Sequence, residues 1–571
     1  MGPPEIGARK RILAFLLLAV LFSGILLFRV GWLESYHGQN LREKALRVRL
    51  RAVPVQAPRG TILDREGRVL ATSLGSFGVY AVPAQVSDKA GAARTLSGIL
   101  EAPALILLSR LQQSAAVVWL KRHASQELVS RLREAGLPGI GVVPEARRFY
   151  PSGTLAAQVL GFAGSDNQGL EGVELSADHY LTGKAGAIRV EMDALNRQMP
   201  WAIRTYTPPV AGDTVVLSLD SHLQLIAERA ARQAQSATGA TGVSILVMDP
   251  NSGEILALAN SPAYNPNAFG EYPSKDWRDP VVSDTFPPGS TFKPITLAAA
   301  LQEKVVSANS RFYDPGYIKV TGVPIRCWKD AGHGSVDLAQ VVANSCNIGF
   351  VIMGEKLGTS TFYRYLRAFG LLSRLGVDLP GEAKSIYPAE KSVRPVDLAV
   401  MAFGQTLAVT PLQLLTAISV IANGGELVRP HVVREVISAA GKVVKPPERV
   451  VIHRVLSADV AKEVTSLLVG VMAGTGKKAV VPGYVLAGKT GTAQAVVNGR
   501  YIDGQYIASF VGFGPVPDPR LATLVVIHRP VGEYYGGQIA APVFAQVMGE
   551  ALTYLKIKPN APVATKPGEA N

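Results

Sequence analysis

The chain has 571 residues, a formal net charge of +14 and a hydrophobic fraction of 48%. This length exceeds that of one ordinary domain, and so large a hydrophobic fraction excludes a disordered chain. The Lys and Arg residues are scattered and accompany no nucleic-acid motif, so we expect no nucleic-acid partner. An anionic membrane surface or polymer beside the protein explains the charge more simply.

The N-terminal segment predicts a membrane anchor. Three consecutive basic residues at 9–11 precede a largely apolar run. Residues 12–33 match the ~20 residues that a membrane helix needs, and Arg29 can extend its charge toward the outer interface. The basic residues place segment 1–11 in the cytoplasm and the remaining chain outside. Since no small-residue cleavage site follows, we expect an uncleaved, single-pass anchor in the cytoplasmic membrane.

Residues 34–215 are predicted to form one mixed α/β domain after the anchor. It starts with a charged helical stretch at 34–51, and glycines and prolines then separate short strands. Two glycine-containing turns, at 150–153 and 169–172, are prominent. We find no catalytic constellation here, and we expect this region to act as a spacer or docking domain.

Residues 216–555 are predicted to form a second domain, followed by a disordered tail at 556–571. Five strand candidates lie near its two ends, and a helical insertion separates them. The candidates and the last helix are 243–249, 254–260, 484–495, 506–513, 521–528 and 541–555. The first two read as a hairpin. Strands from both ends predict one central antiparallel sheet covered by helices, in a protein of the α+β class.

The segment 286–294 carries the sharpest chemical signal. Its prolines and glycine lead into an apolar helix, and Pro294 is tolerated only near a helix start, so the helix begins no earlier than about Ser290. Ser290 and Lys293 then share one face of the first turn. A serine hydroxyl needs a base to become a nucleophile, and a lysine serves when burial or a second cation lowers its pKa. On its own, a serine three residues before a lysine more often lies at a solvent-exposed helix start than in a catalytic pair.

Two further motifs strengthen the catalytic interpretation. A hydroxyl–x–Asn turn follows a predicted helix, and a Lys-Thr-Gly-Thr segment lies inside a predicted strand. Their residues are Ser345, Cys346 and Asn347, and Lys489, Thr490, Gly491 and Thr492. Each motif is commonplace by itself, but this order of three motifs, on these element types, is characteristic of active-serine enzymes.

With these motifs the chain resembles the class B penicillin-binding proteins, from the anchor to about Leu555. The segments that carry the resemblance are 59–67, 404–413, 508–513 and 535–544, and the last two are more similar to the division and sporulation branch. Thr406 departs from the family, which usually has a glycine there. The resemblance implies a peptidoglycan D,D-transpeptidase with a pedestal or dimerisation-type first domain. It also implies covalent binding of penicillin, and a role in septal or spore-wall synthesis.

The resemblance also implies residue roles. Ser290 would be the nucleophile and Lys293 its base, while Ser345 relays a proton to the leaving amine. The remaining motif residues would bind substrate: Asn347 its backbone, Lys489 and Thr490 its terminal carboxylate, and Thr492, beside Gly491, the oxyanion. An amine from a neighbouring stem peptide then takes the acyl group, and neither a cofactor nor a metal is required. Implied partners are stem peptides, β-lactams, the lipid bilayer, division proteins and a membrane-embedded glycan polymerase.

Cys327 and Cys346 leave three interpretations open. Outside the membrane they can form a disulfide, and a bridge at Cys346 would constrain the second motif and make the site sensitive to oxidation. A rival is a zinc site formed by Asp314, Cys327, His333 and Cys346. The third interpretation is a histidine that caps a turn beside two buried thiols.

Three alternative functions remain at this point. A β-lactamase or D,D-carboxypeptidase shares the motifs but does not need the anchor and the large first domain. A bifunctional polymerase would need a glycosyltransferase domain, and no pair of spaced acidic motifs precedes residue 215. A non-catalytic scaffold or β-lactam sensor is disfavoured because every catalytic position is filled.

Overall fold

The computed structural model describes residues 6–115, 117–191, 205–497 and 500–561. The chain divides into two compact units. Unit 1 comprises 1–57, 75–145 and 184–210, and unit 2 comprises 58–74, 146–183 and 211–571. The two units therefore alternate along the chain, whereas the sequence predicted contiguous domains at 34–215 and 216–555. The reason is apolar packing, because Ile62, Leu70 and Leu160 belong to the same buried cluster as Leu217 and Leu258.

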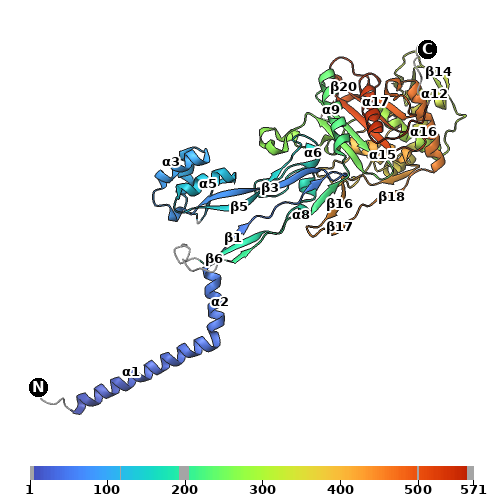
Figure 1. Ribbon diagram of the computed structural model, residues 1–571. Coiled ribbons are helices and arrows are strands. Elements are labelled where there is room, and N and C mark those ends of the chain that lie inside the picture. Colours follow the sequence, from blue (N-terminus) through green and yellow to red (C-terminus); the bar gives the residue numbers. More distant parts are fainter. Residues whose placement is uncertain (1–5, 116, 192–204, 498–499, 562–571) are drawn as a thin grey trace. The chain divides into compact units, whose positions relative to one another are not determined.

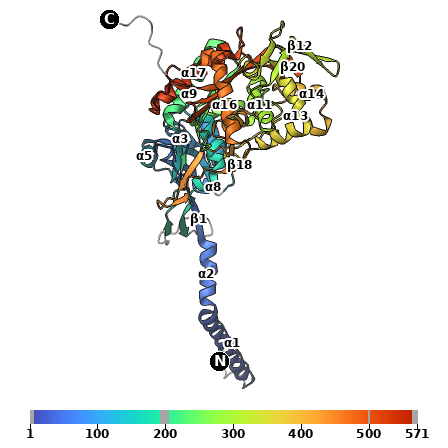
Figure 2. The same ribbon diagram turned by 90° about the vertical axis from the view of Figure 1, so that its right-hand side faces the viewer.

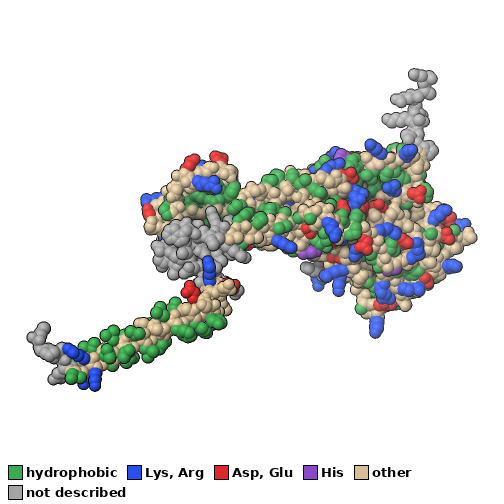
Figure 3. All heavy atoms as spheres, turned by 60° about the horizontal axis from the view of Figure 1, so that its bottom comes forward, with side chains coloured by type: hydrophobic (Ala, Val, Ile, Leu, Met, Phe, Trp, Pro, Cys, Tyr) green, Lys and Arg blue, Asp and Glu red, His purple; other side chains and the backbone are tan. Residues whose placement is uncertain are grey.

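The N-terminal helix α1 (Ile6–Trp32) is apolar and has no buried residue. Figure 3 shows hydrophobic side chains along its visible face and Lys or Arg side chains at its N-terminal end. Among the described residues, one continuous helical stretch, Ile6–Lys44, is long and apolar enough to cross a membrane. This stretch matches the membrane anchor that the sequence predicts. The following helix α2 (Gly38–Arg49) ends slightly before the predicted residue 51, because strand β1 (Leu50–Val55) begins there.

The rest of unit 1 combines β-strands and helices. The end of β3 (Val69–Ala81) pairs antiparallel with β4 (Val118–Ala124), and β5 pairs with β3. β1 pairs with β6, which pairs with β7. The remaining elements are β5 (Ile140–Phe149), β6 (Gly186–Glu191), β7 (Thr205–Thr207), α3 (Lys89–Leu100), α4 (Ala104–Leu111) and α5 (Gln126–Ala135). Val79, Leu96 and Leu107 lie in the buried core of this unit.

Unit 2 contains a central five-stranded antiparallel sheet covered by helices, as the sequence predicts. Its strand order is β10-β9-β21-β20-β19, and Figure 1 labels β20 of this sheet. The strands are β9 (Gly242–Met248), β10 (Ile255–Ser261), β19 (Ala487–Val497), β20 (Arg500–Gly514) and β21 (Leu521–His528). β9 and β10 form the predicted hairpin. Both faces of β9, β10 and β21 are buried, which explains their nearly continuous apolar sequences.

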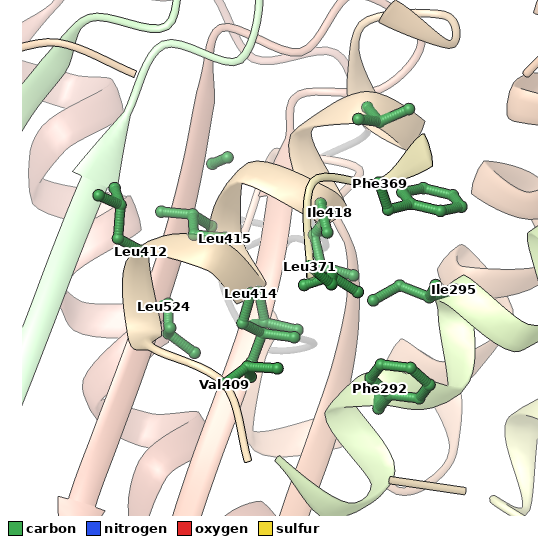
Figure 4. Close-up of a cluster of buried hydrophobic side chains, with 14 of the residues drawn as sticks. Phe292, Ile295, Phe369, Leu371, Val409, Leu412, Leu414, Leu415, Ile418 and Leu524 are labelled. Carbon is green, nitrogen blue, oxygen red and sulfur yellow. The ribbon is translucent and has the colours of Figure 1, made fainter. Parts of the chain in front are cut away.

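Helices cover both faces of this sheet. Helices α9 (Ser221–Thr238) and α17 (Gly536–Tyr554) share one buried cluster with Val247 and Val525 of the strands. The opposite face packs against α15 (Pro411–Ala422), whose every residue is buried. Figure 4 shows Leu412, Leu414, Leu415 and Ile418 of α15 together with Leu524 of β21 and with Phe292 and Ile295. This cluster holds the start of α11 (Lys293–Gln302) in place.

Three more helices complete the part of unit 2 that carries the candidate site. They are α12 (Leu338–Ala343), α13 (Asn347–Ala368) and α16 (Ala458–Ala473). Helix α11 packs against both α13 and α16, and Figure 2 labels all three helices. Unit 2 also contains two small hairpin-like sheets, in which β11 (Arg311–Asp314) pairs with β14 (Gly334–Asp337) and β12 (Tyr317–Val320) pairs with β13 (Val323–Arg326).

The segment 59–67, part of the family resemblance, is a structural centre of unit 2. The buried Arg59 and Arg148 each form an ion pair of 2.5 Å with Glu174, whose side chain has no exposed surface. The Tyr150 hydroxyl donates to the same carboxylate over 3.2 Å. A Cβ atom added to Gly60 would lie 1.8 Å from the carbonyl oxygen of Asp213, so only glycine fits. We call Arg59, Arg148, Tyr150 and Glu174 the Arg59 cluster.

The C-terminal tail is held against unit 2 at its start, contrary to the prediction of disorder from residue 556. The Tyr484 hydroxyl donates to the carbonyl of Ile557 over 2.7 Å. The Asn560 amide donates to the carbonyl of Val516 over 2.6 Å. Composition missed this segment because its contacts are made with residues far away in the sequence. The rest of the predicted tail, 562–571, lies outside the described residues.

Candidate active site

Ser290 lies in a tight 3₁₀ turn, Gly289–Phe292, immediately before α11. The α-helix begins at Lys293, slightly later than the earliest start that the sequence allowed, because this turn precedes it. Gly289 has a φ of 54°, which glycine adopts readily, and its N–H donates to the carbonyl of Gly404 over 3.0 Å. The turn therefore holds Ser290 just before the N-terminal end of the buried helix α11, and the serine itself is half-buried.

Hydrogen bonds connect Ser290 with the second motif and with Lys293. The Lys293 ammonium nitrogen lies 2.7 Å from the carbonyl oxygen of Ser345, 3.1 Å from its Oγ and 2.8 Å from Oδ1 of Asn347. Ser345 Oγ donates to Ser290 Oγ over 3.3 Å. Ser345 has a φ of 53°, a strained value of the kind that accumulates at functional sites. We call Ser290, Lys293, Ser345 and Asn347 the Lys293 cluster.

Lys293 is fully buried. The hydrogen-bond partners described for its ammonium group are all neutral, so none of them supplies a counter-charge. Its Nζ also lies 5.1 Å from the ring centroid of Phe350. Burial removes the hydration that stabilises an ammonium ion, and it lowers the pKa of Lys293 to about 7. A substantial fraction of this amine is therefore neutral near neutral pH, which is the state that a general base needs.

The third motif lies on β19, next to the turn that carries Ser290. A Cβ atom added to Gly289 would lie 3.1 Å from the carbonyl oxygen of Thr492, and one added to Gly491 would lie 2.4 Å from Ser509 Oγ. Lys489 is 1% exposed. Burial, and then the nearby Lys293, lower the pKa of Lys489 well below its usual value. The structure therefore brings all three motifs together.

A pocket of about 600 Å³ opens onto these motifs. It is lined by motif residues and by side chains from other segments. The motif residues are Ser290, Ser345, Asn347, Thr490 and Thr492, and the others include Trp328, Gln405, Thr475, Lys477, Tyr506, Tyr534 and Tyr535. Sequence reasoning did not single out the aromatic wall, in which the rings of Tyr506 and Tyr534 stack at 3.9 Å. Its only signal was the Tyr534-Tyr535 pair just before the last helix.

Thr406, which departs from the family pattern, has a left-handed backbone. Its φ is 62°, and its N–H donates to the Tyr501 hydroxyl over 3.2 Å. Glycine adopts this conformation without strain, whereas a threonine at the same position is strained. The threonine therefore strains the backbone locally, next to Gln405, which lines the pocket.

The structure also gathers the four residues considered for zinc. The ligand atoms of Asp314, Cys327, His333 and Cys346 all lie within 4.8 Å of one another. Both cysteines are buried and free, and the disulfide that the sequence leaves open, with its sensitivity to oxidation, stays a prediction. A hydrogen bond from the Cys346 thiol lowers the pKa of Cys327. We call these four residues the Cys346 cluster.

Taken together, the serine at a helix start, the partly neutral lysine and the strand beside them form the site of an active-serine acyltransferase. Comparison with known proteins agrees. The penicillin binding protein transpeptidase domain matches residues 243–549, and the penicillin-binding protein dimerisation domain matches residues 54–217. The chain therefore belongs to the penicillin-binding proteins, in the class B group that combines these two domains.

The relatives span almost the whole chain. Stage V sporulation protein D of Bacillus subtilis is 38% identical over 98% of this chain and 88% of its own length. Peptidoglycan D,D-transpeptidase FtsI of Escherichia coli is 35% identical over 96% of this chain and 91% of its own. The crystal structure of penicillin binding protein 3 of Mycobacterium tuberculosis with aztreonam has a TM-score of 0.70 and 28% identity. It covers 90% of this chain and 100% of that one.

Proposed function

We propose that this protein is a serine-type peptidoglycan D,D-transpeptidase that cross-links stem peptides during septal or spore-wall synthesis. The observation that carries the proposal is the hydrogen-bonded path from Ser290 through Ser345 to the buried Lys293. Such a path connects a hydroxyl nucleophile with an amine that is partly neutral near pH 7. The names of the relatives, both FtsI and the sporulation protein, support the same reaction and the same occasions.

In the proposed reaction the motif residues divide the work. Lys293 accepts the proton of Ser290, whose Oγ attacks the penultimate D-Ala carbonyl while backbone N–H groups of Ser290 and Thr492 stabilise the oxyanion. As the C–N bond to the terminal D-Ala breaks, Ser345 donates its proton to the leaving amine and takes the proton held by Lys293 in exchange. Asn347 holds the donor backbone. Lys489 and Thr490 bind the terminal carboxylate, and an amine of a second stem peptide then attacks the ester and regenerates Ser290.

The location follows from the anchor. Basic residues at 9–11 lie at the N-terminal end of α1, before its apolar run, and the positive-inside rule then puts the N-terminus in the cytoplasm and the chain after the anchor outside the membrane. Residues 34–215 serve as the pedestal and 216–555 as the catalytic domain in this proposal. Family resemblance suggests that the anchor and the pedestal bind a membrane-embedded glycan polymerase and other division proteins.

The first test is intact-protein mass after incubation with penicillin. We expect a stable adduct on the wild type that is absent from Ser290→Ala and retained by Ser130→Ala, a control serine on the exposed surface of α5. Rapid turnover of penicillin would instead indicate a β-lactamase or carboxypeptidase. The absence of any adduct from folded protein would favour a non-catalytic scaffold. Release of D-Ala from a stem-peptide analogue, accelerated by an added amino-acid acceptor, would then identify the transferase.

A further inference from the structure

The Cys346 cluster joins four separate segments at one buried point. Asp314 ends β11, Cys327 follows β13, His333 precedes β14, and Cys346 is the N-cap residue of α13. Cys327 Sγ lies 3.6 Å from His333 Nδ1, Cys346 Sγ lies 3.2 Å from Asp314 Oδ2, and that oxygen lies 2.7 Å from His333 Nδ1. From this convergence we propose that the four side chains bind one structural Zn²⁺ ion.

The distances suit a tetrahedral ion after small shifts of the ligand atoms, which all lie within 4.8 Å of one another. Bonds of ~2.3 Å to sulfur and ~2.0–2.2 Å to nitrogen and oxygen give ligand–ligand edges of roughly 3.3–3.8 Å. The Cys327–His333 separation already lies in this range, and the Cys346–Asp314 separation is just below it. The Asp314–His333 pair is closer because the two groups hydrogen-bond directly. Two thiolates with an imidazole favour Zn²⁺ over hard cations such as Mg²⁺.

Burial indicates a structural ion rather than a catalytic one. The Asp314 side chain has no exposed surface and that of His333 has 6%, while Cys327 and Cys346 are 3% and 0% exposed. Four protein ligands in a closed site leave no open position for substrate, which is the pattern of structural zinc. A turn-capping histidine beside two inert thiols would not need a fully buried carboxylate at their centre.

Neighbouring groups already orient the ligands, as outer-sphere partners do around zinc. The second oxygen of Asp314, Oδ1, accepts from the Gly316 N–H over 2.8 Å, which leaves Oδ2 directed at the cluster. Cys346 Sγ accepts from the Gly349 N–H over 3.5 Å at the start of α13, where a thiolate is favoured. A Cβ atom on Gly332 would lie 2.2 Å from the carbonyl oxygen of Asp314, so the loop is closely fitted around this aspartate.

A disulfide would use only part of this arrangement. It would join Cys327 to Cys346, but it would not explain why Asp314 and His333 lie against the two sulfur atoms. A zinc ion uses all four groups, and it needs no oxidant because its binding only releases the thiol protons. The zinc site does not depend on the proposed function, and only its effect on acylation rests on that function.

The ion would position the second motif. Cys346 lies between Ser345 and Asn347, so a metal bond to its sulfur holds the strained backbone at Ser345, whose φ is 53°. The Trp328 indole N–H donates to the carbonyl of Asn344 over 2.9 Å, and its ring lies 5.5 Å from that of His333. The loop that carries the ligands is therefore already tied to the motif. Cys327 and His333 are positioning residues in this proposal and do not touch the substrate.

The experiment is a metal analysis of the full-length protein purified in detergent without chelators. We expect about one zinc per chain in the wild type, consistent with one four-ligand site, and loss of that zinc in Cys327→Ser and His333→Ala. The matched control His431→Ala, outside the cluster, should keep it. Replacement of zinc by Co²⁺ should give a thiolate-to-cobalt charge-transfer band in the wild type and in the control, but not in the two variants.

A second measurement covers variants that fold poorly. Added Zn²⁺ should raise the melting temperature of chelator-treated wild type but not of Cys327→Ser. Zinc removal should also slow penicillin acylation at Ser290 roughly tenfold or more, since a misplacement of ~1 Å can reduce rates ~100-fold. Protein purified without chelators that contains no zinc, and whose two thiols react with iodoacetamide or whose mass shows a disulfide, would overturn the metal site. Unchanged acylation after zinc removal would overturn the positioning role, whereas failure of acylation in zinc-loaded protein would count against the proposed function.

Discussion

Unit 2 contains two buried charged clusters that differ in how their charge is neutralised. In the Arg59 cluster, two guanidinium groups surround the carboxylate of Glu174, and each forms an ion pair of 2.5 Å with it. In the Lys293 cluster, an amine is equally buried, but the hydrogen-bond partners described for it are neutral oxygens. The first environment pairs opposite charges, and the second, which offers the ammonium group of Lys293 no counter-charge, favours the loss of its proton.

The difference distinguishes stability from reactivity. The pKa of Arg59 is raised, because the attraction of Glu174 and Asp178 outweighs the burial that opposes it. The pKa of Lys293 is lowered to about 7, because burial is not offset to the same degree. A buried and paired arginine holds the fold together, whereas a buried lysine without a carboxylate partner becomes a base. Burial alone therefore does not identify a catalytic residue.

The largest expected effect is on acylation when Lys293 becomes Arg. Arginine keeps the positive charge but does not release its proton, so the general base is lost, and the acylation rate should fall roughly 10²–10⁴-fold. Stopped-flow or mass measurements of the penicillin adduct test this, with the melting temperature as the control for folding. A variant that acylates at the wild-type rate would show that Lys293 is not the base.

The next largest effect is on stability when Glu174 becomes Gln. Two buried guanidinium groups then lose their shared carboxylate, and the free energy of unfolding should fall by about 3–5 kcal/mol. Denaturant unfolding measures the loss. The control is Arg367→Ala at the exposed Arg367–Glu390 pair, which should change little. Equal effects at both sites would contradict the structural role of the Arg59 cluster.

The pH dependence sharpens the contrast between the clusters. Because the pKa of Lys293 is lowered to about 7, acylation should rise with pH below 7 and level off above it. The unfolded lysine has a pKa near ~10.4, so between these values the unfolded state binds more protons and stability should rise with pH. Lys293→Met should lose this dependence of stability on pH. An acylation rate that is independent of pH from about 5 to 9 would contradict the assigned base.

The smallest expected effect is at Thr406. Thr406→Gly should remove the strain of its left-handed backbone and raise the free energy of unfolding by about 0.5–1 kcal/mol. Gly404→Ala is the opposing control, because its Cβ would lie 2.0 Å from the carbonyl oxygen of Gly289 and displace the turn before Ser290. Thermal unfolding of both variants measures the difference. A destabilised Thr406→Gly would mean that the threonine side chain makes a compensating contact.

Local patterns were enough to predict the anchor, the β9–β10 hairpin, the other strands of the sheet and the three motifs. Each of these depends on residues that are close together in the sequence. The apolar run before Leu33, the turn at 250–253 and the spacing of Ser290 and Lys293 are examples. The role of Ser345 could be suggested by resemblance, but its φ of 53° could not.

Only the tertiary structure decided how distant segments combine. It placed 58–74 and 146–183 in the same compact unit as the sheet, and it brought Tyr506 and Tyr534 to one wall of the pocket. The environment of Lys293 was decided in the same way, because burial by helices from distant segments lowers its pKa. The sequence by itself determined which groups can react, through residue type and local spacing. Their reactivity depends on solvation and on long-range contacts, which only the folded chain creates.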